Sequence, residues 1–359
     1  MIRIDGSKGE GGGQMIRTAL ACSALTGKAF IAESIRAGRP QPGLKAQHLA
    51  GITALEKLCD AKTIDASLGS PAFTFKPGRV HGKTISIDIG TAGSITLLMQ
   101  SVLLPALFAD ETTRFRITGG TDTKWAMPAD FFSNVFLPHC RRFADIDFQL
   151  VRRGYFPKGA GRIDMRIKPK YPLSQYASLP AFLQALREED ISFETIPYKV
   201  ISIKGVSHAS LSLQKGNVAD RTARAAKTAL LKQHIPLDIA VEYTETESPG
   251  SGITLWANCS ADKDELPYQK PIILGSDALG EQKVSAESVG DRAAKDLITP
   301  LHGGSTADKH LVDNLMPLLA LAGGSINAPM TSHALSNIHI LETFLPIKFK
   351  HQGNMISLA

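Results

Sequence analysis

The sequence lacks any hydrophobic run long enough to cross a membrane. Its longest apolar stretch, residues 97–109, is interrupted by Gln100, Ser101 and Pro105, whereas a membrane-spanning helix needs about 18 or more consecutive apolar residues. Residues 1–5 already have the pattern of a strand, so we expect no secretory signal, no membrane partner and a cytoplasmic protein.

Closely spaced cysteines are absent as well. The four cysteines, at positions 22, 59, 140 and 259, lie far apart, and none belongs to a Cys-x-x-Cys pair. This spacing argues against a zinc ribbon and against a disulfide framework, and it fits a reducing compartment. Cys22 and Cys59 lie in apolar helical patterns, so we predict that both are core residues.

The chain has no tail or block of one charge. Its net formal charge is +6 over 359 residues, which permits a polyanionic partner such as RNA but does not require one. The loose basic clusters, at residues 141–142, 152–153 and 158–170, read individually as solvated faces. A composition of 43% hydrophobic and 21% charged residues is typical of a globular protein, and the length suggests about two domains.

Glycine, by contrast, is concentrated near the start of the chain. Five of the eight residues from Gly6 to Gly13 are glycine, between an apolar run and a helical pattern over residues 14–26. Strand, glycine loop and helix N-terminus in this order favour an anion site, because the backbone is accessible and the first helical N–H groups have no internal partner. A tight turn without a ligand is the alternative, since neither G-x-G-x-x-G nor G-x-x-x-x-G-K-[ST] is present in usable form.

Polar residues that follow this loop favour the anion site. They are Glu10, Gln14, Arg17, Arg36, Arg39 and Gln47. The first three would project from the loop and one helix face if the helix begins near Gly11. Arginines pair bidentately with phosphate, so we predict a phosphate-handling site here.

The order of the expected elements repeats along the chain. Ile4-Asp5 returns as Ile87-Asp88 about 80 residues later, and each opens a βαβαββ series. The first unit comprises strands at 2–5, 29–35, 61–67 and 72–76 with helices at 14–26 and 44–59. The second comprises strands at 85–88, 114–118, 146–151 and 163–167 with helices at 95–109 and 128–143. A third, incomplete copy has helices at 309–322 and 333–344 with strands at 325–328, 347–351 and 355–358.

A different segment separates the second and third copies. We expect in it a strand at 198–204, a helix at 219–233, a hairpin of strands 239–244 and 252–258, a strand at 271–274 and a helix at 285–301. The predicted fold class is therefore α/β, in α+β layers. Three βαβαββ repeats form a large domain, residues 1–181 and 304–359, and a smaller α/β domain, residues 182–303, is inserted into the last repeat.

Several short motifs together carry a family resemblance. They are Asp5-Gly6, residues 9–14, 35–39, 42–44 and 47–48, Gly119-Gly120-Thr121-Asp122, Arg153 to Ile163, and Ser332-His333. In this combination the chain closely resembles the RNA 3'-terminal phosphate cyclase family, over nearly its whole length and least in the inserted segment. The resemblance implies the same fold of three repeats with an insert.

The resemblance also implies an activity. Such enzymes are ligases that convert an RNA 3'-phosphate end to a 2',3'-cyclic phosphodiester with ATP and a divalent metal, Mg²⁺ or Mn²⁺. A covalent histidine–AMP intermediate forms, and pyrophosphate and AMP are released. The nucleophilic histidine of the family corresponds to His333, and neutral imidazole is a suitable nucleophile near pH 7. Partners would be RNA, ATP and, as a possibility for the assembly, a second copy in a homodimer.

Other site residues follow from the same resemblance. Glu10 corresponds to the metal-contacting carboxylate, and the phosphate and RNA-end contacts correspond to Gln14, Arg17, Arg36, Arg39 and Gln47. The nucleotide contacts correspond to Gln100, Met127, Pro128, His310, Asp313 and Asn314. Three positions depart from the family pattern, where His310 replaces a tyrosine, Met127 replaces a proline and Ala160 replaces a glycine. The last change matters if that position needs a positive φ.

Alternative functions remain open from the sequence. A catalytically silent relative that assists ribosome assembly is disfavoured, because such relatives lack the nucleophilic histidine. This chain keeps His333, Glu10 and the arginine pair Arg36 and Arg39. A module that only binds RNA 3' ends would form no adenylate. An enolpyruvyl-transferase-like enzyme would share the repeats, but fold likeness is weak support for function. Trp125 is a candidate for stacking on a terminal base, with half-buried packing as its alternative.

Overall fold

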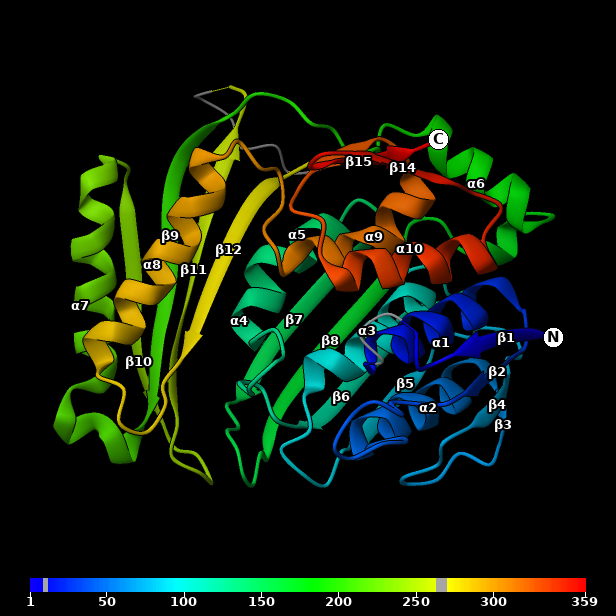
Figure 1. Ribbon diagram of the computed structural model, residues 1–359, viewed down its shortest axis with the longest axis horizontal. Helices are drawn as coiled ribbons and strands as arrows, with labels where there is room; N and C mark the ends of the chain where they lie inside the picture. The colour runs from blue at the N-terminus through cyan, green and yellow to red at the C-terminus, as the bar shows by residue number, and fades with distance from the viewer. Residues whose placement is uncertain (9–11, 263–269) are drawn as a thin grey trace.

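The computed structural model describes residues 1–8, 12–262 and 270–359. These residues form a mixed α/β protein with several small sheets, which confirms the predicted class. The N- and C-termini lie on the same side of the molecule (Figure 1).

The first sheet is built from the first 76 residues. Strand β1 pairs in parallel with β2, and the other pairings are antiparallel, in the order β1-β2-β4-β3. Its elements are β1 (Ile2–Asp5), α1 (Gln14–Thr26), β2 (Phe30–Glu33), α2 (Ala46–Cys59), β3 (Lys62–Ile64) and β4 (Phe73–Lys76).

The second sheet has the same topology. Its order is β5-β6-β8-β7, again with one parallel pair followed by antiparallel pairs. This likeness supports the repeat interpretation. The helical segment before β7 contains a π-helical turn at Phe132–Phe136. The elements are β5 (Thr84–Asp88), α3 (Ile95–Ala106), β6 (Thr113–Gly119), α4 (Ala129–Phe131), α5 (Leu137–Cys140), β7 (Ala144–Arg152) and β8 (Gly161–Pro169).

The third sheet follows the same plan with its first strand reduced to one bridge. Its strand order is β13-β15-β14, and Phe193 bridges in parallel to Gly324, directly before β13. The first-strand position is therefore filled from a part of the chain that precedes the inserted segment. The elements are α9 (Leu311–Ala322), β13 (Ser325–Asn327), α10 (Ser332–Phe344), β14 (Phe349–Gln352) and β15 (Met355–Leu358).

The inserted segment forms a fourth sheet covered by two helices. The predicted hairpin of residues 239–244 and 252–258 is wrong, because β9 lies between these strands and the order is β10-β9-β11-β12. A helix connects β9 to β10, so β10 returns parallel to β9, and β11 pairs with the other side of β9. The elements are β9 (Lys199–Ser210), α7 (Val218–Leu230), β10 (Leu237–Thr244), β11 (Ser251–Ser260), β12 (Ile272–Leu279) and α8 (Ala286–His302).

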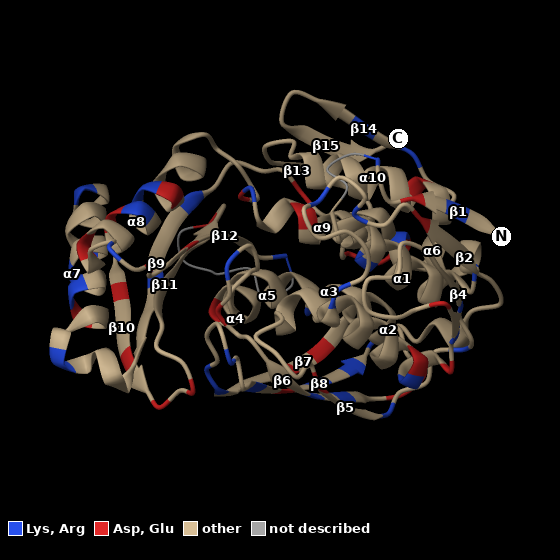
Figure 2. Ribbon diagram, turned by 60° about the horizontal axis from the view of Figure 1, so that its bottom comes forward, with Lys and Arg blue, Asp and Glu red and all other residues tan. Residues whose placement is uncertain are grey.

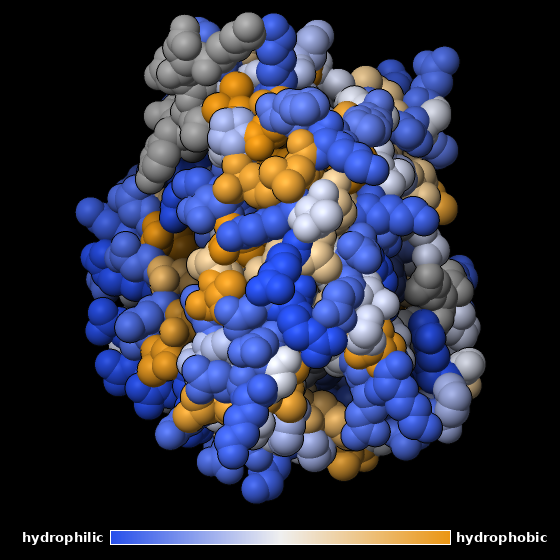
Figure 3. Space-filling view, turned by 90° about the vertical axis from the view of Figure 1, so that its left-hand side faces the viewer, coloured by the Kyte–Doolittle hydropathy of each residue, from blue (hydrophilic) through white to orange (hydrophobic). Residues whose placement is uncertain are grey.

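The outer face of this segment is hydrophilic. Charged side chains occur along both helices, mainly Lys and Arg on α7 and both signs on α8 (Figure 2). The space-filling view of this side is mainly hydrophilic, with separate hydrophobic patches (Figure 3). Both helices are strongly amphipathic, with small residues such as Ala226 and Ala293 buried beneath them. The charged faces keep this side of the molecule solvated.

The side chains form two hydrophobic cores. One joins the three repeat sheets and their helices, and the other lies beneath α7 and α8. The structure has a helix that the sequence did not predict, α6 (Leu179–Glu188). Phe182 of α6 and Phe193, which follows it, are both buried in the first core. We therefore propose that the large unit continues to Phe193, beyond the expected boundary at residue 182, before the inserted unit begins.

Helix α1 is the centre of the large unit. Every residue of α1 from Gln14 to Leu25 is buried, and α1 contacts α2, α3 and α10, between which it lies in Figure 1. A helix buried on all sides requires internal partners for its polar side chains. Because Gln14, Arg17 and Thr18 are among them, the sequence of α1 requires a polar network inside the protein.

The buried cysteines and the helix lengths agree with the absences noted in the sequence. All four cysteines are buried and unpaired, as predicted for Cys22 and Cys59. No helix within the described ranges combines the length and apolar character that a membrane crossing needs.

The glycine-rich turn between β7 and β8 holds a non-glycine residue, Ala160, at a positive φ. Ala160 has a φ of 57°, in the left-handed region where a Cβ is unfavourable by about 1–2 kcal/mol. We expect Ala160→Gly to raise the free energy of unfolding by about 0.5–1 kcal/mol, after the larger backbone entropy of glycine in the unfolded chain is deducted. Urea unfolding followed by circular dichroism measures this change.

The same substitution in a helix provides the control. Ala229 lies inside α7, where Ala→Gly lowers stability by about 1 kcal/mol. Opposite signs for Ala160→Gly and Ala229→Gly are expected. A loss of stability in both variants would contradict the strain assigned to residue 160.

A buried histidine gives a pH-dependent term in stability. Burial, with a smaller effect of Arg142, lowers the pKa of His139 to about 3, so the folded protein keeps this imidazole neutral while the unfolded chain protonates it below pH 6.5. The folded state therefore loses stability as pH falls from 6.5 towards 3, by up to about 1.4 kcal/mol per pH unit for this group. Carboxyl groups with raised pKa values, such as Asp277, act in the opposite direction.

A variant isolates the contribution of His139. We expect His139→Phe to flatten the dependence of unfolding free energy on pH between 6.5 and 4.5, relative to wild type, in urea titrations. The matched control is His351→Gln on β14, at an exposed position, which we expect to leave the profile unchanged. Parallel profiles for wild type and His139→Phe would show that His139 binds protons equally in the folded and unfolded protein, which would contradict the lowered pKa.

Candidate functional site

The N-terminus of α1 is held close to side chains of α2. Helix α1 begins at Gln14, after Gly13, as predicted for the helix over residues 14–26. A Cβ on Gly13 would overlap His48 and would lie 2.8 Å from Nη1 of Arg17. Only glycine fits here without displacing these groups, so the backbone N–H end of α1 is close to both.

Cationic side chains gather around this helix end. Burial and then Arg36 lower the pKa of Arg17 to about 10, and burial and then Arg39 lower the pKa of Arg36. Burial, followed by Arg17 and Arg36, lowers the pKa of His48 to about 3. Within the described ranges, no carboxylate lies within ion-pair distance of Arg17 or Arg36. We call Arg17, Arg36, Arg39 and His48 the cation cluster.

Two donors of the cation cluster are buried and have no hydrogen-bond partner among the described residues. They are Nε of Arg36 and Nε2 of His48. Nδ1 of His48 accepts a hydrogen bond from the backbone N–H of Lys45 at 3.0 Å, so the neutral imidazole carries its proton on Nε2. Buried donors without acceptors, beside a helix N-terminus, fit a phosphate oxygen.

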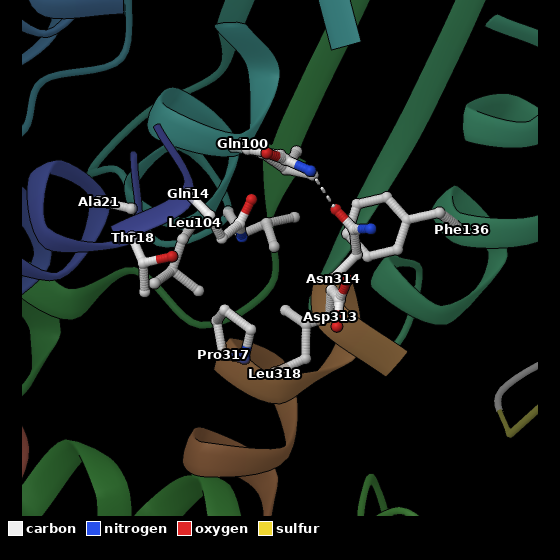
Figure 4. A pocket seen from close by; sticks show the side chains of 12 residues that line it. Gln14, Thr18, Ala21, Gln100, Leu104, Phe136, Asp313, Asn314, Pro317 and Leu318 are labelled. Carbon is white, nitrogen blue, oxygen red and sulfur yellow. Dashed lines mark hydrogen bonds between the residues drawn. The ribbon is translucent and has the colours of Figure 1, made fainter. Parts of the chain in front are cut away.

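Arg17 also belongs to a chain of hydrogen bonds between helices. Its Nη2 donates to Gln14 at 2.8 Å and its Nε donates to Gln100 of α3 at 2.7 Å. The amide of Gln100 then donates to Oδ1 of Asn314 of α9 at 2.8 Å, as Figure 4 shows. Three helices from three repeats thus meet through side chains that the sequence assigned to phosphate and nucleotide binding.

Asn337 of α10 adds a fourth helix. Its Oδ1 accepts hydrogen bonds from Thr18 at 2.7 Å and from Gln14 at 3.3 Å, and its amide donates to the carbonyl of Asp313 at 2.7 Å. Asn337 is fully buried. We call the side chains of Gln14, Arg17, Thr18, Gln100, Asn314 and Asn337 the polar network.

His333 lies at the start of α10, one turn before Asn337. Thr331 caps this helix by accepting the backbone N–H of Ala334 at 2.9 Å, and it hydrogen-bonds to the carboxylate of Asp313. His333 is partly buried. The cap fixes the helix start, so the position of His333 follows from contacts with α9.

His310 lies close to His333 and to the segment that follows Met127. Burial is the first cause of the lowered pKa of His310, and His333 contributes to it. The ring of His310 meets Phe131 of α4 edge to face, with 6.4 Å between centroids. Met127 is buried and its carbonyl accepts a hydrogen bond from Thr96 at 2.6 Å, while Pro128 precedes α4. The residues expected around a base therefore border one region.

A cavity lies on the α3 and α9 side of the polar network. Its polar lining includes Gln14, Thr18, Gln100, Asp313 and Asn314, and Figure 4 shows Gln100 and Asn314 on one side of it with Gln14 and Thr18 on another. Apolar side chains complete the wall, and these are Ala21, Leu103, Leu104, Leu107, Phe136, Pro317 and Leu318. Four of the predicted site residues thus line a single cavity.

Of two further predicted residues, Gln47 contacts a neighbouring loop and Glu10 has no described position. The side chain of Gln47 accepts a hydrogen bond from the backbone N–H of Ser94 at 3.4 Å, so it reaches the loop before α3 as well as the neighbourhood of His48. The expected metal ligand Glu10 lies outside the described residues, and its role stays a prediction.

The sequence reasoning missed three members of the site. His48 stood inside a family motif but not among the candidate residues, and Thr18 and Asn337 were absent from both. The signal for Thr18 and Asn337 was a polar residue inside a strongly apolar helical pattern. Asn337 also lies four residues after His333, on the same helix face.

Comparison with known proteins identifies the family of this chain. Residues 8–351 match the family model described as RNA 3'-terminal phosphate cyclase. The chain belongs to this family. It is 40% identical over 357 residues to an RNA 3'-terminal phosphate cyclase of Pyrococcus furiosus, with 99% of this chain and 96% of the relative covered. Similar proteins of the same name occur in Archaeoglobus fulgidus, at 40% identity with 99% of both chains covered, and in Methanopyrus kandleri, at 38% with 98% and 96% covered.

A second group of ionisable side chains in this cyclase-family protein lies between the large and inserted units. Asp122, Asp130 and His208 place ligand atoms within 4.8 Å of one another. However, Nη1 of Arg153 lies 2.7 Å from Asp130, and Nη2 lies 2.7 Å from Glu242 of β10. A guanidinium already compensates these carboxylates, so the group does not fit a metal centre and instead links the two units.

Burial sets the protonation of this linking group. It lowers the pKa of His208 to about 3 and raises the pKa of Asp122, whereas the surrounding carboxylates raise the pKa of Arg153. The hydroxyl of Tyr155 lies 2.7 Å from Nδ1 of His208. The inserted unit is thus joined to the turn between β7 and β8 by a largely buried cluster of ion pairs and hydrogen bonds.

The cation cluster gives a direct prediction on anion binding. We expect inorganic pyrophosphate to raise the melting temperature of the wild type, and Arg36→Gln to weaken this binding about tenfold or more, as loss of a charged hydrogen bond does. The free variant should melt no lower than wild type, because it removes one of several like charges. Thermal melts against pyrophosphate concentration measure both effects.

A distant arginine provides the control for charge alone. Arg224→Gln changes an exposed residue of α7 and should leave pyrophosphate protection unchanged. Equal protection of wild type and Arg36→Gln would remove Arg36 from the anion site. A large drop in the melting temperature of the free Arg36→Gln variant would mark the residue as structural.

Proposed function

We propose that this protein converts RNA 3'-phosphate ends to 2',3'-cyclic phosphodiesters at the expense of ATP. The observation that carries the proposal is the convergence of His333, the polar network and the cation cluster, from helices of all three repeats, in a chain that belongs to the cyclase family. A histidine nucleophile beside several phosphate-binding groups suits phosphoryl and nucleotidyl transfer, in which positioning and charge stabilisation dominate.

The proposed first step is transfer of AMP to the protein. A ring nitrogen of His333 attacks the α-phosphorus of ATP, a P–N bond forms, and pyrophosphate leaves. Gln100, Met127, Pro128, His310, Asp313 and Asn314 would hold the nucleoside, and Gln14 and Arg17 the phosphates. The departures at His310 and Met127 leave a ring and a thioether to pack against a base.

The second and third steps complete the reaction on RNA. An oxygen of the RNA 3'-phosphate attacks the phosphorus of the AMP on His333. The P–N bond breaks, the imidazole is released, and AMP is joined to the RNA end through a phosphoanhydride. The neighbouring 2'-hydroxyl then attacks the phosphorus of the RNA 3'-phosphate, and AMP leaves as the cyclic phosphodiester forms. Arg36, Arg39 and Gln47 would hold the RNA phosphate, because planar guanidinium groups pair with phosphate oxygens.

Two further residues are included in this proposal. His48 would donate from Nε2 to a phosphate oxygen, as its unpartnered buried donor suggests. Glu10 would hold Mg²⁺ or Mn²⁺, ions that prefer oxygen ligands, and a divalent ion would neutralise charge on the phosphates. A homodimer and a cytoplasmic location also stay predictions.

The decisive prediction concerns His333. Incubation with ATP labelled in its α-phosphate and a divalent metal, without RNA, should label the wild type on a denaturing gel. The label should be labile to acid and discharged by RNA with a 3'-phosphate. His333→Ala should carry none, because no other group replaces the nucleophile.

A histidine on the same helix provides the matched control. His339 is exposed on α10, and His339→Ala should be labelled like the wild type. Label on His333→Ala would assign the nucleophile elsewhere. No label on the wild type, with ATP and metal present, would instead favour a silent relative or a protein that only binds RNA ends.

A further inference from the structure

Two loops next to the candidate site expose aromatic rings to solvent. Trp125 is 90% exposed and Phe156 is 76% exposed. No other Trp or Phe in the described part of the chain is exposed to this extent. A single exposed ring needs no explanation, but exposed apolar side chains that gather on one surface mark interaction sites.

The two loops are joined to each other. Trp125 belongs to the loop of residues 120–128 and Phe156 to the loop of residues 153–160. The backbone N–H of Thr121 donates to Gly154 at 2.9 Å, and Asp122 bridges to Tyr155. The two exposed aromatics therefore lie on neighbouring loops, which together form one surface.

The same surface continues to the cation cluster. The N–H of Gly120 donates to Gly93 at 2.9 Å, and the N–H of Ser94 donates to Gln47 at 3.4 Å. Gln47 directly precedes His48 of the cation cluster. A chain lying across residues 120–128 would thus end beside the groups proposed to hold an RNA 3'-phosphate.

The backbone at Trp125 is held in an uncommon conformation. Its φ is 62°, in the left-handed region that bulky residues rarely adopt. The ring contributes nothing to the hydrophobic core, so packing does not explain this conformation. Such residues tend to mark places where a side chain must be presented outward.

Cations accompany the rings. Nζ of Lys124 lies 5.6 Å from the Trp125 ring centroid and 3.0 Å from Glu281. Lys158, two residues after Phe156 in the same loop, lies 3.7 Å from Glu247. These ion pairs are exposed and therefore weak, so phosphates can replace their carboxylates. We call Lys124, Trp125, Phe156 and Lys158 the aromatic loop surface.

We propose that the nucleotides just upstream of the RNA 3' end lie on the aromatic loop surface, with unpaired bases stacked on Trp125 and Phe156 and phosphates near Lys124 and Lys158. Aromatic side chains bind single-stranded bases by stacking, without sequence preference, while lysines track the backbone. This inference rests on the proposed function, since it takes the 3' end to lie at the cation cluster. The added cations favour RNA over an uncharged protein surface.

Tryptophan fluorescence tests the proposal. The sequence has two tryptophans, so the background variant Trp256→Phe leaves Trp125 as the sole indole. We expect its emission to be quenched by single-stranded oligoadenylate with a 3'-phosphate when the chain has eight nucleotides, and less when it has two. In the wild-type background, Trp125→Ala and Phe156→Ala should each weaken binding of the eight-nucleotide probe about tenfold.

Controls separate stacking from general effects. Leu231→Ala removes another exposed hydrophobic side chain, on the inserted unit, and should bind the probe like the wild type. Trp125→Phe should retain part of the affinity that Trp125→Ala loses. Melting temperatures near that of the wild type should show that the variants are folded.

The outcomes separate this proposal from the proposed function. Unchanged probe affinity in Trp125→Ala and Phe156→Ala, with no quenching, overturns the surface even if ATP labels His333. Quenching and tenfold weaker binding support the surface even if ATP gives no label, in which case the proposed activity fails alone. Loss of a dimer in sedimentation of Trp125→Ala, with probe affinity unchanged, would make the surface a protein interface and overturn the proposal.

Discussion

The burial of Arg17 in the central helix is the constraint on which the large unit depends. A guanidinium inside a helix bundle is costly unless every donor is used and its charge is balanced. Gln14 and Gln100 accept two of its hydrogen bonds, but neither carries a charge. The arrangement leaves a positive charge inside the protein, which an anion can compensate.

That constraint explains why helices of all three repeats converge. Gln100 needs Asn314 for its own amide, and Gln14 and Thr18 need Asn337. The polar groups of α1 find partners on α3 and α10, and Gln100 of α3 finds its own partner on α9, so the helices have one arrangement that satisfies all of them. The same side chains border the cavity and the start of α10, which holds His333. The same contacts therefore stabilise the packing of the helices and determine the geometry of the candidate site.

The inserted unit is tied to this centre at two places. Asp308 accepts the backbone N–H of Gly275 of β12 and also that of Leu311 at the start of α9, each at 2.9 Å. Arg153 joins Asp130 to Glu242 across the other contact. Movement of the inserted unit would therefore act on α9, the helix that carries Asp313 and Asn314, and on the loop that carries Trp125.

Much of this was determined by the sequence itself. Local patterns gave helix α1 its bounds, because an apolar period of 3.6 residues between Gly13 and Gly27 leaves little choice. The family motifs named several of the side chains that meet at the site, among them Arg17 and Gln100. The spacing of the cysteines and the apolar helical patterns around Cys22 and Cys59 also predicted that these two are buried and unpaired.

Other features were decided only by tertiary structure. The order of β10 and β11 about β9 depends on pairing between distant segments, which local alternation does not encode. The positive φ of Ala160 and the unpartnered Nε2 of His48 arise from neighbours that come together only on folding. The sequence specifies which groups are present, and long-range packing decides which of them lose water and which remain without a partner.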